Sequence, residues 1–279
     1  MTAETSENKV DTLKQWLGAI ERTRGPGLCR TISICNQKGG VGKTVTAINL
    51  SAFLAAYGRR TLLIDLDPQG HSGLGLGVKT EALEHSIYDV LVNGECPIDK
   101  AIVSRRPNLD ILPSNIDLAS AELELTRFEK REGRLRNLLD GLGERYAYIV
   151  IDCPPSLGVL TVNALVASQM VIIPVTPAYL SIHGLLKVTE TVDALIDALA
   201  LQIRIFFLIT FFEKQLREAH LQRGRIERLF GNDLLKTVIR KNTRLNEATR
   251  EGLAIFEYDR YSPGCRDYFN LAKEIMDVG

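Results

Sequence analysis

The sequence is poor in cysteine and histidine. Its 279 residues contain five cysteines, none in a Cys-x-x-Cys pair, and four histidines that show no metal-ligand spacing. These absences argue against structural zinc, an iron–sulfur cluster or a disulfide framework, and they favour a reduced, cytoplasmic protein. Apolar residues make up 45% of the chain, which is enough for one or two packed cores.

Net charge and long hydrophobic runs are also missing. Lysine plus arginine and aspartate plus glutamate both number 34, so any nucleic-acid-binding surface must be local. The longest apolar stretch, residues 205–212, is too short to cross a bilayer, and the N-terminus has no apolar core of signal-peptide length. We therefore expect neither export nor a membrane span.

Short apolar runs alternate with amphipathic segments along most of the chain. The apolar runs predict strands at 31–35, 61–65, 109–112, 148–151, 171–175, 203–210 and 235–239. The amphipathic segments predict helices at 44–57, 118–142, 160–167, 182–199 and 217–230. This alternation predicts an α/β fold with a doubly wound, mostly parallel sheet flanked by helices, which binds ligands beyond the carboxyl ends of its strands.

Residues 1–28 stand apart from this pattern. They contain an apolar stripe at helical spacing, formed by Val10, Leu13, Trp16, Leu17 and Ile20. The turn-like Gly25-Pro26-Gly27 ends it. We predict an N-terminal helical arm over 1–28 and a second domain over 29–279. The sequence leaves open whether the arm packs on the body or is a mobile, partner-binding element.

A glycine-rich stretch, NQKGGVGKT at 36–44, follows the first predicted strand. Its glycines allow a tight turn that points backbone N–H groups at a phosphate chain, with the next helix aiming its N-terminus at the same anion. Lys43 supplies positive charge to the β- and γ-phosphates, and the Thr44 hydroxyl is placed to ligate Mg²⁺. A merely structural glycine-rich turn is the weaker alternative.

The loop departs from the general pattern G-x-x-x-x-G-K-[ST]. Gln37 stands where that pattern has its first glycine, and Lys38 is a second lysine that phosphate binding within one loop does not need. The strings LLIDLDPQG at 62–70 and YIVIDCPPSLG at 148–158 accompany this variant. Together the three motifs resemble the ParA/Soj branch of the MinD–ParA ATPases.

The resemblance continues to the C-terminal part of the chain. Further matching strings are LTVNAL at 160–165, AYLSIHGL at 178–185 and RKNTRLNEA at 240–248, so it covers roughly residues 30 to 277. It implies a P-loop NTPase fold and a Mg-dependent ATP hydrolase that is slow until a partner stimulates it. ATP and Mg²⁺ are the implied cofactors.

In the resembling family, the lysine matched by Lys38 reaches the phosphates bound by the other subunit. Two protomers sandwich two ATP molecules, so the homodimer depends on the nucleotide state. A lysine from each side would offset the repulsion between two triphosphate groups. The alternative is an ordinary solvated loop lysine. The implied catalytic residues are Lys38, Lys43 and Asp67, with Asp67 orienting or activating the attacking water.

Carboxylates at strand ends supply the implied metal site. Asp65 ends one predicted strand and is implied to lie near the magnesium shell, and Asp152 ends another and is implied to hold Mg²⁺, together with Thr44. Cys153 follows Asp152 directly, but a thiol nucleophile has no histidine base nearby in sequence. The four histidines are predicted to be structural or on the surface.

The implied ATP-binding set has a phosphate part and a base part. It comprises Lys38, Gly39, Gly40, Val41, Gly42, Lys43, Thr44, Val45, Phe211, Arg240 and Asn242. The base part departs from the family, which usually has proline near Arg240 and often methionine at Phe211. We still expect ATP, because Asn242 can read a purine edge and Arg240 can stack on the ring.

Local charge suggests a second ligand. Residues 213–250 carry ten basic and five acidic side chains. Alone, such a run is usually a solvated face, but in ParA relatives this region of the ATP-bound dimer holds DNA without sequence preference. The candidate DNA-binding residues are Lys241, Arg244, Arg217 and Arg250.

Several functions use this scaffold. The resemblance implies partition of chromosome or plasmid DNA with a ParB-like partner, and a nucleoid-associated location. A MinD-like membrane cycle needs a basic amphipathic C-terminal helix, whereas CRDYFNLAKEIMDVG is predicted to dock its apolar side on the body. Positioning of another cargo, or catalysis on a small metabolite, are the further alternatives.

Overall fold

An eight-stranded sheet runs through the part of the chain that the computed structural model describes, residues 29–94 and 96–278. Its strand order is β3-β4-β2-β5-β1-β6-β7-β8. The strands are β1 Arg30–Ile34, β2 Thr61–Asp65, β3 Val103–Arg106, β4 Leu109–Leu112, β5 Tyr148–Asp152, β6 Met170–Val175, β7 Arg204–Phe212 and β8 Leu234–Arg240. All seven predicted strands are present. The predicted arm, residues 1–28, lies outside the described residues.

Seven strands run parallel, as the sequence predicts. β1 lies between β5 and β6, and the residues of these three strands are almost entirely buried because helices cover both faces of the sheet. β3 is antiparallel to β4 at the sheet edge. The sequence analysis missed β3, since its residues Val-Ser-Arg-Arg are partly exposed and contain no apolar run.

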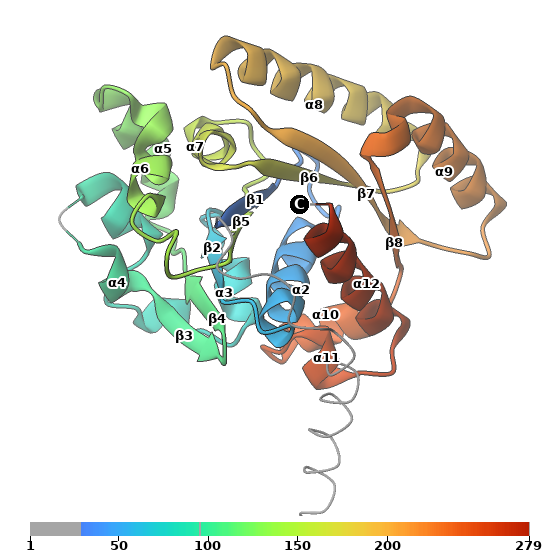
Figure 1. Ribbon diagram of the computed structural model, residues 1–279, viewed down its shortest axis with the longest axis horizontal. Coiled ribbons are helices and arrows are strands. Elements are labelled where there is room, and N and C mark those ends of the chain that lie inside the picture. The colour runs from blue at the N-terminus through green and yellow to red at the C-terminus, as the bar shows by residue number, and fades with distance from the viewer. Residues whose placement is uncertain (1–28, 95, 279) are drawn as a thin grey trace, which may run out of the picture.

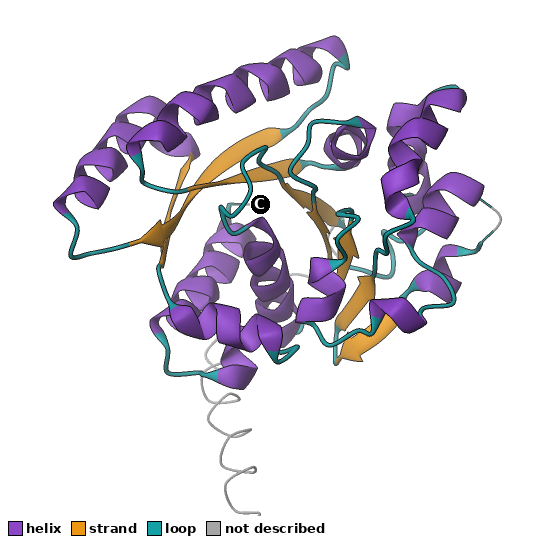
Figure 2. Cartoon of the chain, turned by 180° about the vertical axis from the view of Figure 1, so that it is seen from behind, coloured by secondary structure: helices purple, strands orange, loops and turns teal. Residues whose placement is uncertain are grey.

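Two layers of helices enclose the sheet. The α-helices are α2 Lys43–Ala56, α3 His71–Gly75, α4 Ile98–Ala101, α5 Leu118–Glu124, α6 Arg134–Leu139, α7 Val159–Ala167, α8 Tyr179–Ala198, α9 Arg217–Phe230, α10 Thr243–Arg250, α11 Ile255–Tyr258 and α12 Pro263–Asp277. In Figure 1 the sheet curves around α2 and α12, while α5 to α9 lie outside it. Figure 2 shows the same two layers from behind. The described helices include none with the length and hydrophobicity of a membrane span.

The single helix predicted over 118–142 is wrong. The chain forms α5, a 3-10 turn at Leu125–Arg127 and, after a break, a second 3-10 turn at Arg131–Gly133 that leads into α6. At the break Phe128 is extended and Lys130 has φ 53°, a left-handed conformation that no α-helix contains. The apolar residues of both helices still face the core, which is why their spacing resembled that of one helix.

The C-terminal helix α12 docks on the body, as predicted. Its N-cap Ser262 accepts a hydrogen bond from the backbone N–H of Cys265 at 3.1 Å. Tyr268, Leu271 and Ile275 are almost completely buried on the side that packs against α2 and β8. The apolar face of this helix is therefore occupied by the protein's own core.

An ion pair joins α12 to the end of β8. Both oxygens of Asp267 accept from Arg240: Nη2 donates at 2.6 Å, Nε at 2.9 Å, and the Arg240 backbone N–H also at 2.9 Å. The Asp267 side chain is 8% exposed and that of Arg240 is 24% exposed. Such a bidentate pair in a largely buried position fixes the helix relative to the strand.

Replacing Asp267 with alanine is expected to lower the free energy of unfolding by about 2 to 3 kcal/mol, because it leaves a partly buried guanidinium without its partner. The figure is below that for a fully buried pair, since Arg240 keeps some solvent contact. Urea denaturation measures the change. The matched control is Glu251→Ala, which removes the exposed pair with Arg250 and should cost less than about 0.5 kcal/mol. Equal losses in the two variants would contradict the structural role of Asp267.

Candidate nucleotide-binding site

The glycine-rich loop lies between β1 and α2 and is fastened to the neighbouring strands. Asn36 is buried; its Nδ2 donates to the backbone oxygen of Pro174 in β6 at 2.8 Å, and its Oδ1 accepts from the Lys38 N–H at 2.9 Å. Gly40 has φ 71° and Gly42 has φ 89°, conformations that favour glycine. The loop therefore forms a fixed turn in which residues Gln37 to Gly40 are exposed.

A second anchor comes from β7. The Thr210 hydroxyl donates to the backbone oxygen of Val41 at 2.8 Å, and a Cβ added to Gly42 would lie 3.3 Å from the ring of Phe211. Phe211 itself has φ 52°, where the register between β7 and β8 shifts. The structure thus places Phe211 against the loop, in the region where the sequence analysis expected it; its contact with a base stays a prediction.

The two lysines of the loop lie in different environments. Lys43 is 7% exposed, and its Nζ donates to the backbone oxygen of Lys38 at 3.3 Å. A buried ammonium held by a carbonyl favours an anion at the same place. The side chain of Lys38 is exposed at the rim of the loop. One lysine therefore serves the interior of the loop and the other faces outward.

Two buried carboxylates lie side by side beneath the loop. Asp65 and Asp152 end β2 and β5, where they are directly opposite in the parallel register, and both are completely buried. Ser72 at the start of α3 bridges them: its N–H donates to Asp65 Oδ2 and its hydroxyl to Asp152 Oδ2, both at 2.9 Å. The sequence analysis missed Ser72, because only the folded chain brings it between two aspartates that are distant from each other in sequence.

The remaining contacts divide the roles of the aspartates. Both oxygens of Asp65 accept backbone N–H groups, from Asp67 at 3.1 Å and from Ser72 and Gly73, so Asp65 shapes the turn that leads into α3. Oδ1 of Asp152 is buried and, within the described residues, has no hydrogen-bond partner. A buried carboxylate oxygen of this kind can ligate a cation, so Mg²⁺ would fit better at Asp152 than at Asp65.

Burial raises the pKa of both carboxyl groups. The pKa of Asp65 lies well above its usual value because of burial and the neighbouring charge of Asp152. Burial also raises the pKa of Asp152 to about 6, although the hydroxyls of Thr44 and Ser72 and the charge of Lys43 act in the opposite direction. Thr44 and Asp152, predicted as metal ligands, are thus brought together, in a place where a cation would stabilise the charged carboxylates.

Asp67 lies in the turn between β2 and α3. It is partly exposed, and its Oδ1 accepts the N–H of Gln69 at 3.0 Å, which fixes the side chain in an Asx turn. Cys153, in contrast, is buried against Cys35 with their sulfurs 2.9 Å apart, and burial raises its pKa well above the usual value. A protonated, inaccessible thiol does not act as a nucleophile.

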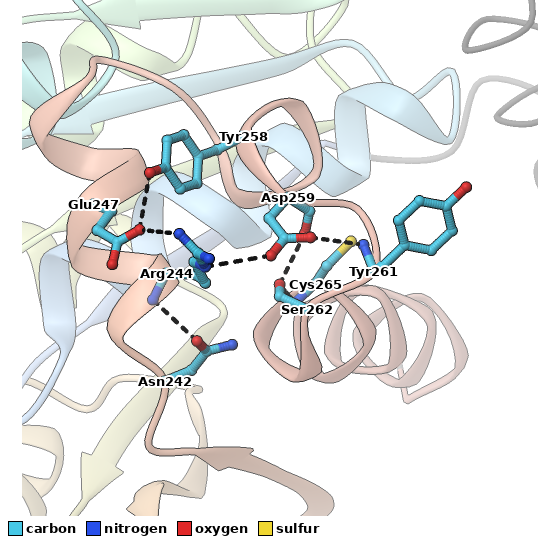
Figure 3. Close-up of polar contacts among 8 residues, drawn as sticks. All are labelled: Asn242, Arg244, Glu247, Tyr258, Asp259, Tyr261, Ser262 and Cys265. Atoms are coloured by element: carbon cyan, nitrogen blue, oxygen red, sulfur yellow. Dashed lines mark hydrogen bonds and ion pairs between the residues drawn. The ribbon is translucent and has the colours of Figure 1, made fainter.

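The other two residues predicted to contact the base, Asn242 and Arg240, are held differently. Asn242 caps α10, its Oδ1 accepting the N–H of Arg244 at 3.0 Å (Figure 3), while its Nδ2 is buried and has no partner among the described residues. That amide can donate to an acceptor on a purine edge. The Arg240 guanidinium is instead engaged with Asp267 and the backbone oxygen of Pro263. Its stacking on a base stays a prediction and would compete with these contacts.

Three of the four predicted DNA-binding residues are paired with carboxylates on the surface. Lys241 lies 3.0 Å from Glu213, Arg244 lies 2.7 Å from Glu247 and 3.6 Å from Asp259 (Figure 3), and Arg250 lies 3.5 Å from Glu251. All three basic side chains are more than half exposed, so each pair is weak. Arg217, at the start of α9, is exposed as well, and no ion pair to it is seen among the described residues.

The comparisons with known proteins agree with this geometry. A family described as an AAA domain matches residues 29–205. The sporulation initiation inhibitor protein Soj of Bacillus subtilis is 42% identical over 90% of this chain and 99% of its own length. The chromosome partitioning protein ParA of Myxococcus xanthus is 42% identical over 88% of each chain. The chain belongs to the ParA/Soj family of P-loop ATPases.

Solved structures extend the ParA/Soj comparison to bound ligands. Cobyrinic acid a,c-diamide synthase of Mycobacterium smegmatis has been determined with ADP and magnesium and with an ATP analogue and magnesium. It is 30% identical to this chain, covers 89% of it and 94% of its own length, and superimposes with a TM-score of 0.78. This structural similarity confirms the predicted P-loop fold, and the identity to Soj and ParA confirms the predicted resemblance to that family.

Replacing Asp152 with asparagine is expected to stabilise the ligand-free protein at neutral pH. The pKa of Asp152 is about 6 in the folded state and about 3.9 in an unfolded chain. Between these values only the folded state keeps the proton, so its stabilisation is complete below pH 4 and is lost as the pH rises through 6. A neutral asparagine avoids this loss and should add about 1 to 3 kcal/mol at pH 7.5.

Urea denaturation in EDTA at pH 4.5 and pH 7.5 measures the effect, which should be larger at the higher pH. The control is Asp110→Asn. Asp110 is also buried, but it accepts a hydrogen bond from the Tyr146 hydroxyl at 2.8 Å and pairs with Arg60, so its substitution should destabilise the protein at pH 7.5. A loss of stability in Asp152→Asn at that pH would contradict the raised pKa.

Proposed function

We propose that this chain is a ParA-type ATPase that binds ATP and Mg²⁺, dimerises around the nucleotides and holds DNA without sequence preference. In this function a ParB-like partner accelerates hydrolysis, and the release of the dimer drives partition of chromosome or plasmid DNA on the nucleoid. The identity of 42% to Soj and ParA over most of each chain supports partition as the process.

The observation that carries the proposal is the division between the two loop lysines. Lys43 is buried within its own phosphate loop, so it is positioned to neutralise the nucleotide bound by the same chain. Lys38 is exposed on the rim, five residues earlier. An exposed rim lysine contributes to a phosphate site when a second protomer closes over that rim, because burial then strengthens its attraction to the opposite nucleotide.

The acidic side of the site fits the remaining parts of an ATPase. Thr44 and Asp152 would hold Mg²⁺, which neutralises phosphate charge when it is bound. Asp67, partly exposed and held in an Asx turn, is available to orient a water molecule. Asn242 has a buried Nδ2 donor without a partner among the described residues, which would be available to the base. These residues come from four segments that the sheet brings to one edge.

Two alternatives use the same scaffold. A MinD-like membrane cycle would need a free amphipathic helix at the C-terminus, but Tyr268, Leu271 and Ile275 of α12 are buried in the core. An enzyme that acts on a metabolite is favoured by the structural similarity to cobyrinic acid a,c-diamide synthase, at 30% identity. The higher identity to partition proteins favours our proposal, and stimulation of ATP hydrolysis by DNA would distinguish it from both.

Replacing Lys38 with alanine is expected to abolish the ATP-dependent dimer while the monomer still binds nucleotide through Lys43. Sedimentation velocity with ATP and Mg²⁺, together with nucleotide binding measured by fluorescence, tests both statements. The control is Lys79→Ala, which removes another exposed lysine and should leave the dimer intact.

Asp67→Ala is the complementary variant. It should retain the dimer and lose most of the ATP turnover, because only the attacking water is affected. A Lys38→Ala protein that dimerises like the wild type would overturn the proposed contact across the interface, and normal turnover by Asp67→Ala would overturn the proposed role of that carboxylate.

DNA binding is expected to require ATP and to weaken steeply with salt. Binding of the full chain to a random duplex is measured with ATP, ADP or no nucleotide over a range of salt concentrations. Arg217→Ala and Lys241→Ala should each reduce the slope of log K against log salt by roughly 0.9, if each contributes one phosphate contact. Arg131→Ala, in the segment between α5 and α6, is the control and should leave the slope unchanged.

Arg244 is not substituted in this experiment, because its loss would also break its ion pairs with Glu247 and Asp259. An unchanged slope in Arg217→Ala and Lys241→Ala would place the DNA contacts elsewhere on the chain. Absence of DNA binding in every nucleotide state would reject the partition function itself.

A further inference from the structure

A large groove lies at the amino ends of the parallel strands, whereas the nucleotide site lies at their carboxyl ends. Its volume is about 1200 Å³, and its lining residues come mainly from the segments that precede β1, β2, β5, β6 and β7 and from the ends of α6 and α7. The phosphate loop, Asp65 and Asp152 instead follow the carboxyl ends of their strands. The groove is therefore separated from the proposed ATPase chemistry by the length of the strands.

The lining of the groove combines apolar side chains with charged ones, among them Arg60, Arg136 and Glu144. Leu139, Val166, Leu199, Leu201 and Ile203 contribute side chains to its wall. Leu199 is 38% exposed, a large apolar surface left open to water. Within the described residues, none of the buried side-chain atoms that lack hydrogen-bond partners belongs to the lining. The groove exceeds the usual volume of small-molecule sites, and its mixture of apolar and charged side chains suits an amphipathic segment of chain.

The described chain begins in this groove. Cys29 lines it, and the Arg30 N–H donates to the backbone oxygen of Ala147, another lining residue, at 3.1 Å. Because β1 lies in the middle of the sheet, between β5 and β6, the chain before Cys29 departs from the centre of this edge and not from its rim. The segment before Cys29 is therefore attached to the chain directly beside the groove.

The preceding sequence contains a matching surface. The apolar stripe at residues 10–20 would span about 16 Å as a helix. The eight residues 21–28 can extend to about 28 Å and include Gly25-Pro26-Gly27, which allows the chain to reverse. The connection is therefore long enough for the stripe to fold back onto the groove.

We propose that the groove is the docking site of residues 10–20 of the same chain. In this arrangement the stripe of Val10, Leu13, Trp16, Leu17 and Ile20 covers Leu199 and its apolar neighbours. Covalent attachment raises the effective concentration of the segment, so an interface of modest area is sufficient. The proposal is independent of the nucleotide site and of the proposed partition function.

Trp16 is the single tryptophan of the chain and therefore reports on docking. In the nucleotide-free full chain at low concentration, its emission should be blue-shifted and protected from acrylamide. Leu199→Glu places a charge in the groove wall and should expose Trp16, with a red shift and severalfold stronger quenching. Leu229→Glu, on α9, changes a leucine that is 50% exposed outside the groove and should leave the emission unchanged.

The controls separate docking from misfolding. Circular dichroism and ATP turnover of Leu199→Glu should match the wild type, and the milder Leu199→Ser should expose Trp16 to an intermediate degree. A solvent-exposed Trp16 in the wild type, or emission unaffected by either Leu199 substitution, would overturn the proposal. So would a blue shift that disappears on dilution, since that would identify a second copy as the occupant.

Discussion

The nucleotide site depends on two carboxylates that the parallel sheet forces together. Asp65 and Asp152 end adjacent strands in register, so their side chains are buried side by side. Their repulsion and their burial both oppose ionisation. The surrounding structure offsets this cost with backbone N–H groups on Asp65, the Ser72 bridge and the nearby charge of Lys43. A divalent cation held by Asp152 would add to this compensation, and the Ser72 bridge would couple it to the turn that carries Asp67.

The parts predicted from sequence are those that a local pattern determines. Buried parallel strands are continuous apolar runs, and the glycines and lysines of the phosphate loop are contiguous, so both could be found without a structure. The break near Lys130 and the exposed strand β3 follow from tertiary contacts that short windows do not contain. Ser72 and Asp267 were missed for the same reason, since each acts on a residue that only the fold brings close.

The base and DNA regions show how ion pairs limit inference from sequence. A row of basic residues indicates a cationic surface, yet Arg240 is committed to Asp267 and most of the candidate DNA contacts have a carboxylate neighbour. These pairs differ in burial, so they differ in consequence. The Arg240 pair is structural, whereas the exposed pairs of Lys241 and Arg250 can exchange a carboxylate for a phosphate at little cost.

The carboxyl and amino ends of the parallel strands carry different chemistry, and the reason is topological. Carboxyl ends of parallel strands collect loops, helix N-termini and buried charge, which suit a nucleotide and a metal. The amino ends collect the C-termini of α6 and α7 and the entry of β1, which leave an apolar wall at Leu139, Val166 and Leu201. Because the first strand is central, the residues that precede it enter the sheet at that wall. A segment with an apolar stripe at this position can acquire a binding site without any change to the catalytic edge, so the ATPase core and the arm can vary independently.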